Sequence, residues 1–217
     1  MKIKTLIDII TSDLGDNESG YENTTWSRAQ IRDWIVEGYN TVFDNRPDLF
    51  MEHKVIKVAH CSTLQDTCDC TKIRRVLGQA NEKGRVFNPL RERGLEIGFQ
   101  WTGKTCSRKS SGKFLLESYA IDKTSENLYV YPEVPPSEDV YIVVECSVRP
   151  TASTEEDDIK DDGYAAVIQW VLWRAKSMDV EVSPASQSAA QLHYRAFFDV
   201  LGITLDKQTV IHKRDNT

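Results

Sequence analysis

The feature that most constrains this sequence is a hydrophobic spacing that changes twice along the chain. Apolar residues recur with helical period up to about residue 46, and short apolar segments separated by turn residues follow to about residue 149. Near residue 162 the helical spacing returns. With 217 residues, the chain can form one domain or two small ones. The two changes predict helices at both ends and a β-domain between them.

Two helices are predicted before the β-rich stretch. Ser27 at the N-cap with Gln30 three residues later forms a capping box, and Trp26 with Ile31 forms a hydrophobic staple. Pro47 ends this second helix, because the residue before a proline is disfavoured in helical conformation. The first helix, over residues 3–14, has one apolar face: Ile3, Leu6, Ile7, Ile10 and Leu14.

The remaining elements complete the prediction. Antiparallel strands are expected at 53–59, 73–79, 85–88, 113–121, 127–131 and 139–148. A third helix follows from about residue 164, and a fourth begins with Ser183 and Pro184 and ends at Gly202. The predicted fold class is α+β: an antiparallel bundle of four helices (1–50 and 151–202), an antiparallel β-domain inserted between helices two and three (51–150), and an extended C-terminal tail (203–217).

Charge is distributed unevenly along the chain. Residues 72–113 carry eleven Lys and Arg against three Glu, a net charge of +8. Residues 151–162 carry −5, from one lysine and six acids: Glu155, Glu156, Asp157, Asp158, Asp161 and Asp162. The simplest interpretation of these acids is a solvated approach to the next helix, whose N-terminus favours carboxylates. The charges of the basic stretch are likewise expected to alternate along the faces of strands rather than to form a sequence-specific nucleic-acid site.

One motif matches a nucleotide-binding consensus. Gly98, Gly103, Lys104 and Thr105 satisfy G-x-x-x-x-G-K-[ST], in which backbone amides and the lysine hold phosphates. The motif needs a buried strand before it and a helix after it. Residues 91–96 are too polar for that strand and residues 106–112 cannot open an amphipathic helix, so a surface loop is expected. A small P-loop-like nucleotide-binding protein remains the alternative function.

No cofactor, metal or membrane span is expected. The five cysteines are an odd number, which favours free thiols over a disulfide framework. His60, Cys61, Cys68 and Cys70 could suggest zinc, but a C-x-C spacing fits structural zinc poorly. No segment approaches 18 consecutive apolar residues, and the four histidines are scattered without a nucleophile constellation.

Several short motifs also occur in a characteristic order. They are Trp26-Ser27, Trp34-Ile35, Arg46-Pro47-Asp48, Arg74-Arg75-Val76, Tyr129-Val130-Tyr131-Pro132, Asp162-Gly163-Tyr164-Ala165, Trp170-Val171-Leu172-Trp173-Arg174-Ala175 and His193-Tyr194. Together they resemble the head-to-tail adaptor family of short-tailed bacteriophages, over roughly residues 3–202. The resemblance implies a non-enzymatic structural protein of the virion, assembled in the host cytoplasm as a twelve-copy homo-oligomeric ring. Such a ring joins the portal protein to the tail nozzle protein, is a possible attachment point for tail fibres, and lets genome DNA pass non-specifically through its channel.

Two groups of residues are then candidates for function. A channel through which DNA slides should avoid fixed cationic contacts, so the six acids of residues 155–162 are expected to line or approach the lumen. The tail is expected to order on binding the portal, with many copies restoring affinity through avidity. Its candidate contact residues are Leu205, Lys207, Val210, Ile211, Lys213 and Arg214. A frayed terminus is the plain alternative for the tail, and a monomeric partner-binding module is a third function.

Overall fold

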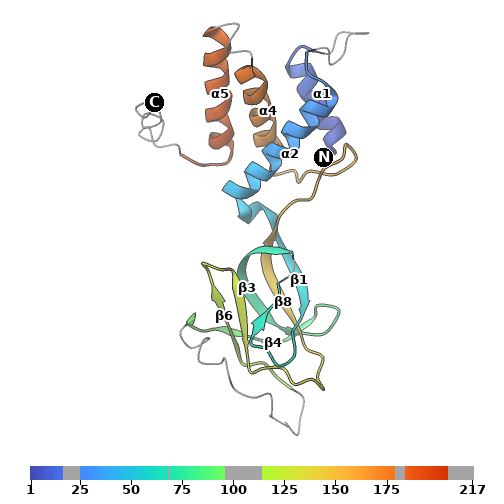
Figure 1. Ribbon diagram of the computed structural model, residues 1–217, viewed down its shortest axis with the longest axis vertical. Coiled ribbons are helices and arrows are strands. Elements are labelled where there is room, and N and C mark those ends of the chain that lie inside the picture. Colours follow the sequence, from blue (N-terminus) through green and yellow to red (C-terminus); the bar gives the residue numbers. More distant parts are fainter. Residues whose placement is uncertain (17–24, 68, 96–113, 179–183, 205–217) are drawn as a thin grey trace. The chain divides into compact units, whose positions relative to one another are not determined.

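The computed structural model describes residues 1–16, 25–67, 69–95, 114–178 and 184–204. It divides into a helical unit, residues 1–49 and 150–217, and a β unit, residues 50–149 (Figure 1). Each unit has its own core. No helix among the described ranges is long and apolar enough to cross a membrane.

Four α-helices are described in the helical unit: α1 (Ile3–Asp13), α2 (Arg28–Asn45), α4 (Tyr164–Met178) and α5 (Pro184–Val200). Helix α1 buries the predicted apolar face, with Ile3, Leu6, Ile7 and Ile10 fully enclosed. The Ser27 side chain accepts a hydrogen bond from the Gln30 amide at 3.2 Å, as the capping motif predicts.

The predicted antiparallel bundle of four helices is wrong, although the chain is α+β. Helix α4 packs against α1, α2 and α5 (Figure 1). Over the described residues, α5 makes no comparable contact with α1 or α2, so the four helices do not close around a common axis. The physical reason is that α4 is apolar on several sides and serves as a central helix. It buries Val171 and Leu172, and Trp170 contacts α5.

Helices α4 and α5 are joined by five aromatic rings that contact one another in a closed circuit. Trp170 lies 4.6 Å from Trp173 and 5.1 Å from Phe197, measured between ring centroids. Tyr194 connects Trp173 to Phe198 at 5.1 Å on each side, and the two phenylalanines lie 5.0 Å apart. Three of these contacts are edge-to-face and two are tilted, and aromatic pairs of this kind stabilise a helix pair beyond the area they bury. The aromatic residues of two motifs named above, Trp170 to Ala175 and His193-Tyr194, therefore pack against each other.

Over its described residues, the β unit forms two four-stranded sheets that share one core. The strands are β1 (Met51–Lys57), β2 (Leu64–Gln65), β3 (Cys70–Ala80), β4 (Val86–Pro89), β5 (Arg91–Glu92), β6 (Ser118–Asp122), β7 (Asn127–Tyr131) and β8 (Tyr141–Val148). A 3-10 helix, η1 (Pro47–Phe50), precedes β1. The sheet orders are β1-β8-β3-β4 and β2-β7-β6-β5. Ile142 and Val144 from one sheet and Leu128 and Val130 from the other belong to the same buried cluster.

Two further expectations about the β unit are wrong. The unit is not purely antiparallel, because β5 and β6 run parallel. The cysteines are not all free thiols: Cys70 and Cys146 form a disulfide with Cα atoms 5.7 Å apart, and Cys61 is also disulfide-bonded. The pairing of β3 with β8 brings Cys70 and Cys146 together across 76 residues of sequence. Counting cysteines could not reveal that register.

Candidate functional site

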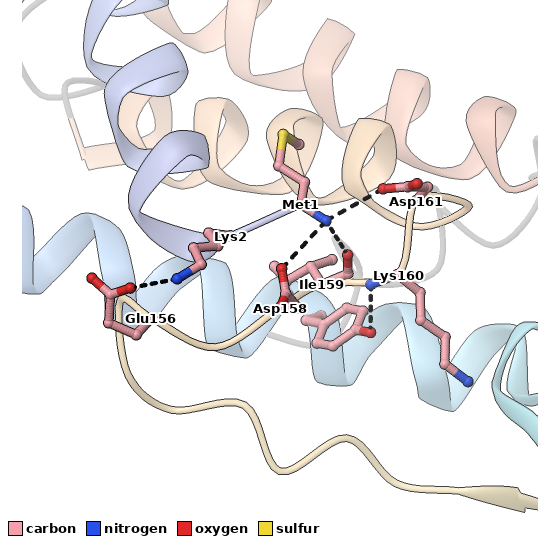
Figure 2. A network of polar contacts seen from close by, with 8 residues as sticks. Met1, Lys2, Glu156, Asp158, Ile159, Lys160 and Asp161 are labelled. Atoms are coloured by element: carbon pink, nitrogen blue, oxygen red, sulfur yellow. Dashed lines mark hydrogen bonds and ion pairs between the residues drawn. The ribbon is translucent and has the colours of Figure 1, made fainter.

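The acidic segment, residues 155–162, lies against the first residues of the chain. Lys2 and Asp158 form an isolated antiparallel bridge, and the Ile159 amide donates to the Met1 carbonyl at 2.8 Å. The Met1 ammonium in turn donates to the Ile159 carbonyl at 2.8 Å (Figure 2). Ile159 is buried at the centre of this contact, while its charged neighbours are exposed. The burial of Ile159 thus helps to hold this polar segment against the start of the chain.

Ion pairs surround this backbone pairing. The Met1 ammonium lies 3.3 Å from a carboxylate oxygen of Asp161 and 3.8 Å from one of Asp158 (Figure 2). The Lys2 ammonium lies 2.6 Å from Glu156. The hydrogen bond between the Lys2 ammonium and the Glu156 carboxylate lowers the pKa of Glu156 and raises the pKa of Lys2. Part of the segment's negative charge is therefore balanced within the chain.

Arg28 joins the acidic segment to the helices. Its guanidinium donates to Asp8 of α1 at 2.8 Å and to Glu155 at 3.1 Å. The two carboxylates raise the pKa of Arg28, mainly through these hydrogen bonds. One side chain at the start of α2 thus contacts both α1 and the segment that leads to α4.

Asp157 organises the backbone that enters the segment. Its carboxylate accepts hydrogen bonds from the amides of Ser153 and Thr154, at 2.8 and 2.7 Å. These bonds to the ionised form lower the pKa of Asp157. The remaining predicted acid, Asp162, is exposed.

The six predicted channel residues therefore divide by role. Glu155 and Asp157 are half-buried and make internal contacts. The exposed carboxylates are those of Glu156, Asp158, Asp161 and Asp162. The sequence gives the charge of this segment, but the contact with the chain's first residues needs the tertiary structure.

The predicted tail contacts, Leu205, Lys207, Val210, Ile211, Lys213 and Arg214, lie outside the described residues, but the point where the tail leaves α5 is described. Gly202 has φ +69°, as expected for a residue that ends a helix. Its amide donates to the backbone carbonyl of Asp199 at 3.0 Å, and the Ile203 amide donates to the backbone carbonyl of Phe198 at 2.9 Å. This double pairing is a Schellman motif. The predicted helix end at Gly202 is correct.

Arg46 contacts this helix end, a contact that the sequence pattern does not predict. Its guanidinium donates two hydrogen bonds to Asp48, at 2.8 and 2.7 Å, and a third to the carbonyl of Leu201. The Asp48 hydrogen bonds lower the pKa of that carboxyl group and raise the pKa of Arg46. The available signal in the sequence is the motif Arg46-Pro47-Asp48, in which an arginine at a helix end lies two residues before an aspartate.

The other candidate motifs are placed less fully. Gly98, Gly103, Lys104 and Thr105 lie outside the described residues, as does Cys68. Cys70 is engaged in the disulfide. Within the described ranges, no group of three or more His, Cys, Asp or Glu side chains is arranged to hold a metal ion.

Part of the basic stretch is paired within the β unit. Arg75 donates to Glu145 at 2.5 Å and Arg74 at 3.4 Å. The Arg75 hydrogen bond lowers the pKa of Glu145.

In the helical unit, His193 is an ordinary hydrogen-bonded histidine. Its Nδ1 atom lies 2.8 Å from the Gln169 side chain, and burial lowers the pKa of His193. These groups stabilise the fold.

Comparison with known families identifies the class of protein. The sequence profile of the SU10 adaptor protein family matches residues 1–214. The chain therefore belongs to this family of bacteriophage head-to-tail adaptors, which confirms the resemblance seen in the motifs. It is a structural protein of the virion, located at the neck, where an adaptor contacts portal and tail components. No curated protein matches the chain.

Proposed function

We propose that copies of this chain form a ring, of twelve subunits, that joins the portal to the tail nozzle and surrounds the DNA ejection channel. The observation that carries this proposal is the family match over residues 1–214, nearly the whole chain. The division into two units supports it, because separate units can contact separate neighbours. The function requires no catalysis.

The C-terminal tail is the proposed portal contact. In this proposal Val210 and Ile211 fill an apolar groove between portal subunits, while Lys213 and Arg214 pair with acidic groups at its rim. Leu205 and Lys207 make contacts nearer to α5. Support comes from the sequence pattern and from the firmly ended helix that precedes the tail. Many weak copies acting together give a stable joint.

The exposed carboxylates of the acidic segment are the proposed channel surface. Negative charge repels the DNA backbone and prevents the counterion release that makes cationic surfaces bind it. Support comes from the exposure of Glu156, Asp158 and Asp161, whose side chains are 68, 73 and 86% accessible. Glu155 and Asp157 hold the segment in place in this proposal.

The decisive experiment mixes the protein with purified portal rings and measures native mass and particle symmetry. We expect rings of the adaptor on one face of the portal, and a monodisperse monomer that ignores the portal would overturn the proposal. A variant truncated after Thr204 should fold with an unchanged melting profile but fail to join. A Gln208→Ala variant serves as the matched control, because it keeps all six proposed tail contacts. If the truncated protein joins normally, the tail is only a terminus.

The nucleotide-binding alternative has its own test. Magnesium-dependent ATP binding that is lost in Lys104→Ala would contradict a purely structural role. We expect titration calorimetry to detect no ATP binding to the unmodified chain.

A further inference from the structure

We infer that Arg46 is a positioning residue that fixes the direction in which the C-terminal tail leaves α5. The inference deepens the proposed function, because it rests on the tail as the portal contact. It concerns a residue in the helical unit that lies outside the tail and outside the acidic segment.

The argument begins with the carbonyl groups at the end of α5. The last four carbonyls of a helix have no partner within the helix. Here the carbonyls of Phe198 and Asp199 accept the amides of Ile203 and Gly202. The Leu201 carbonyl, one position beyond the helix, accepts the guanidinium of Arg46 instead. A cation at a helix C-terminus is also favoured by the helix dipole.

Three successive residues at the root of the tail are therefore fixed. Leu201 is held through its carbonyl, and Gly202 and Ile203 through their amides. Leu201 is also buried, with 2% of its surface exposed. The Schellman motif alone would fix the tail relative to α5. The Arg46 contact additionally fixes it relative to α2.

Arg46 can serve as a reference point because it is itself held on two sides. Its amide donates to the Val42 carbonyl at 2.7 Å, at the end of α2. Asp48 in η1 accepts its Nε and Nη2 groups in a two-point contact. This fork leaves Nη1 directed at Leu201. A lysine has no planar fork and could not make both contacts in this geometry.

The functional consequence follows from symmetry. Tails that bind many equivalent grooves at once gain avidity only if their roots place them within reach of those grooves. A root that rotates freely would lower the effective concentration of each tail at its groove. Arg46, which is remote in sequence from the tail, restricts that rotation through its hydrogen bond to Leu201.

The test uses Arg46→Lys and Asp48→Asn, with Arg32→Lys as the matched control. Arg32 lies within α2, which ends immediately before Arg46, and its guanidinium also donates two hydrogen bonds to a neighbouring aspartate, Asp33. The first measurement is hydrogen exchange at the amides of Gly202 and Ile203. Loss of a charge-assisted hydrogen bond at the helix end should speed their exchange about tenfold in Arg46→Lys. The control should exchange like the unmodified chain.

The second measurement is the affinity of each variant for portal rings. We expect weaker joining by Arg46→Lys and Asp48→Asn, with unchanged melting of the helical unit. Unchanged exchange at the two amides in Arg46→Lys would overturn the inference, as would faster exchange with undiminished portal affinity. A truncation after Thr204 separates the two ideas. If the truncated protein still joins the portal, the proposed function of the tail is wrong, and so is the directing role of Arg46. If amide exchange is normal in Arg46→Lys but the truncated protein fails to join, only the inference about Arg46 is wrong.

Discussion

The β unit is formed by one continuous stretch of chain, whereas the helical unit is assembled from two stretches that the β unit separates. The β unit has a core drawn from both sheets, and a disulfide lies within that core. The helical unit combines its apolar faces with polar contacts between distant residues, such as Lys2 with Glu156 and Arg46 with Leu201. The β unit also has polar contacts between distant residues, such as Arg75 with Glu145. The difference is that all five cysteines lie in the β unit, whose core contains a covalent link, and substitutions should show how much each unit depends on its other contacts.

The largest expected effect comes from truncating the central helix. Leu172→Ala in α4 removes a buried side chain and should lower the free energy of unfolding of the helical unit by about 2–5 kcal/mol. Ile142→Ala, at a fully buried position of β8, should destabilise the β unit by a similar amount. Denaturant unfolding followed by circular dichroism measures both. A loss of less than about 0.5 kcal/mol for Leu172→Ala would mean that its face of α4 does not pack as described.

Buried polar side chains should sharpen the contrast between the units. Gln79 in β3 is buried and bonds to the Phe114 carbonyl and the Leu116 amide, at 3.0 and 2.9 Å. Gln79→Leu leaves both backbone groups without this partner, so we expect a loss of about 1–3 kcal/mol. Gln169→Leu is the counterpart in the helical unit. Because Gln169 and its partner His193 are only half-buried, water can replace the lost bond, and thermal unfolding should change little.

Two glycine substitutions compare the tolerance of each unit for an added methyl group. A Cβ at Gly78 would lie 2.5 Å from the backbone oxygen of Asn88, which cannot move without shifting β4. A Cβ at Gly38 would meet the Trp170 ring at 2.9 Å, and alanine favours the helix by about 1 kcal/mol. Gly78→Ala should therefore be less stable than Gly38→Ala by about 1–2 kcal/mol. Equal melting temperatures would contradict this order.

The smallest effect concerns pH and the helical unit. Folding lowers the pKa of Asp157 below its ordinary value of 3.8, because the carboxylate accepts two amides. Its stabilisation is therefore complete above pH 3.8 and is lost as the pH falls through the lower folded value. Asp157→Asn should flatten this part of the pH dependence of thermal unfolding. Asp162→Asn, at an exposed position of the same segment, is the control for the loss of one negative charge.

Much of the local structure could be predicted from the sequence. The apolar face of α1, the cap at Ser27 and the end of α5 at Gly202 follow from spacing and backbone chemistry, which act over a few residues. Strand β7 also has the predicted bounds, 127–131. Strands β2 and β5 were missed because two residues carry no periodic signal.

What could not be predicted depends on contacts between distant residues. The disulfide between Cys70 and Cys146 requires the register of β3 against β8. The role of Arg46 requires the end of α5 to lie beside the end of α2, 155 residues away in sequence. The arrangement of helices around α4 likewise depends on which of its faces are covered, and its apolar residues alone are compatible with several packings.

The contact between the first residues and residues 155–161 bears on how the protein is made. During translation, α1 and α2 leave the ribosome before α4 and the acidic segment have been synthesised. At about 5–20 residues per second, the intervening β unit delays their partners by about 5–20 seconds. Throughout that interval Ile3, Leu6, Ile7 and Ile10 can contact α2 but lack the part of their covering that α4 later supplies, while the β unit can already fold. The first helices therefore expose part of their apolar surface until the last helices have been made.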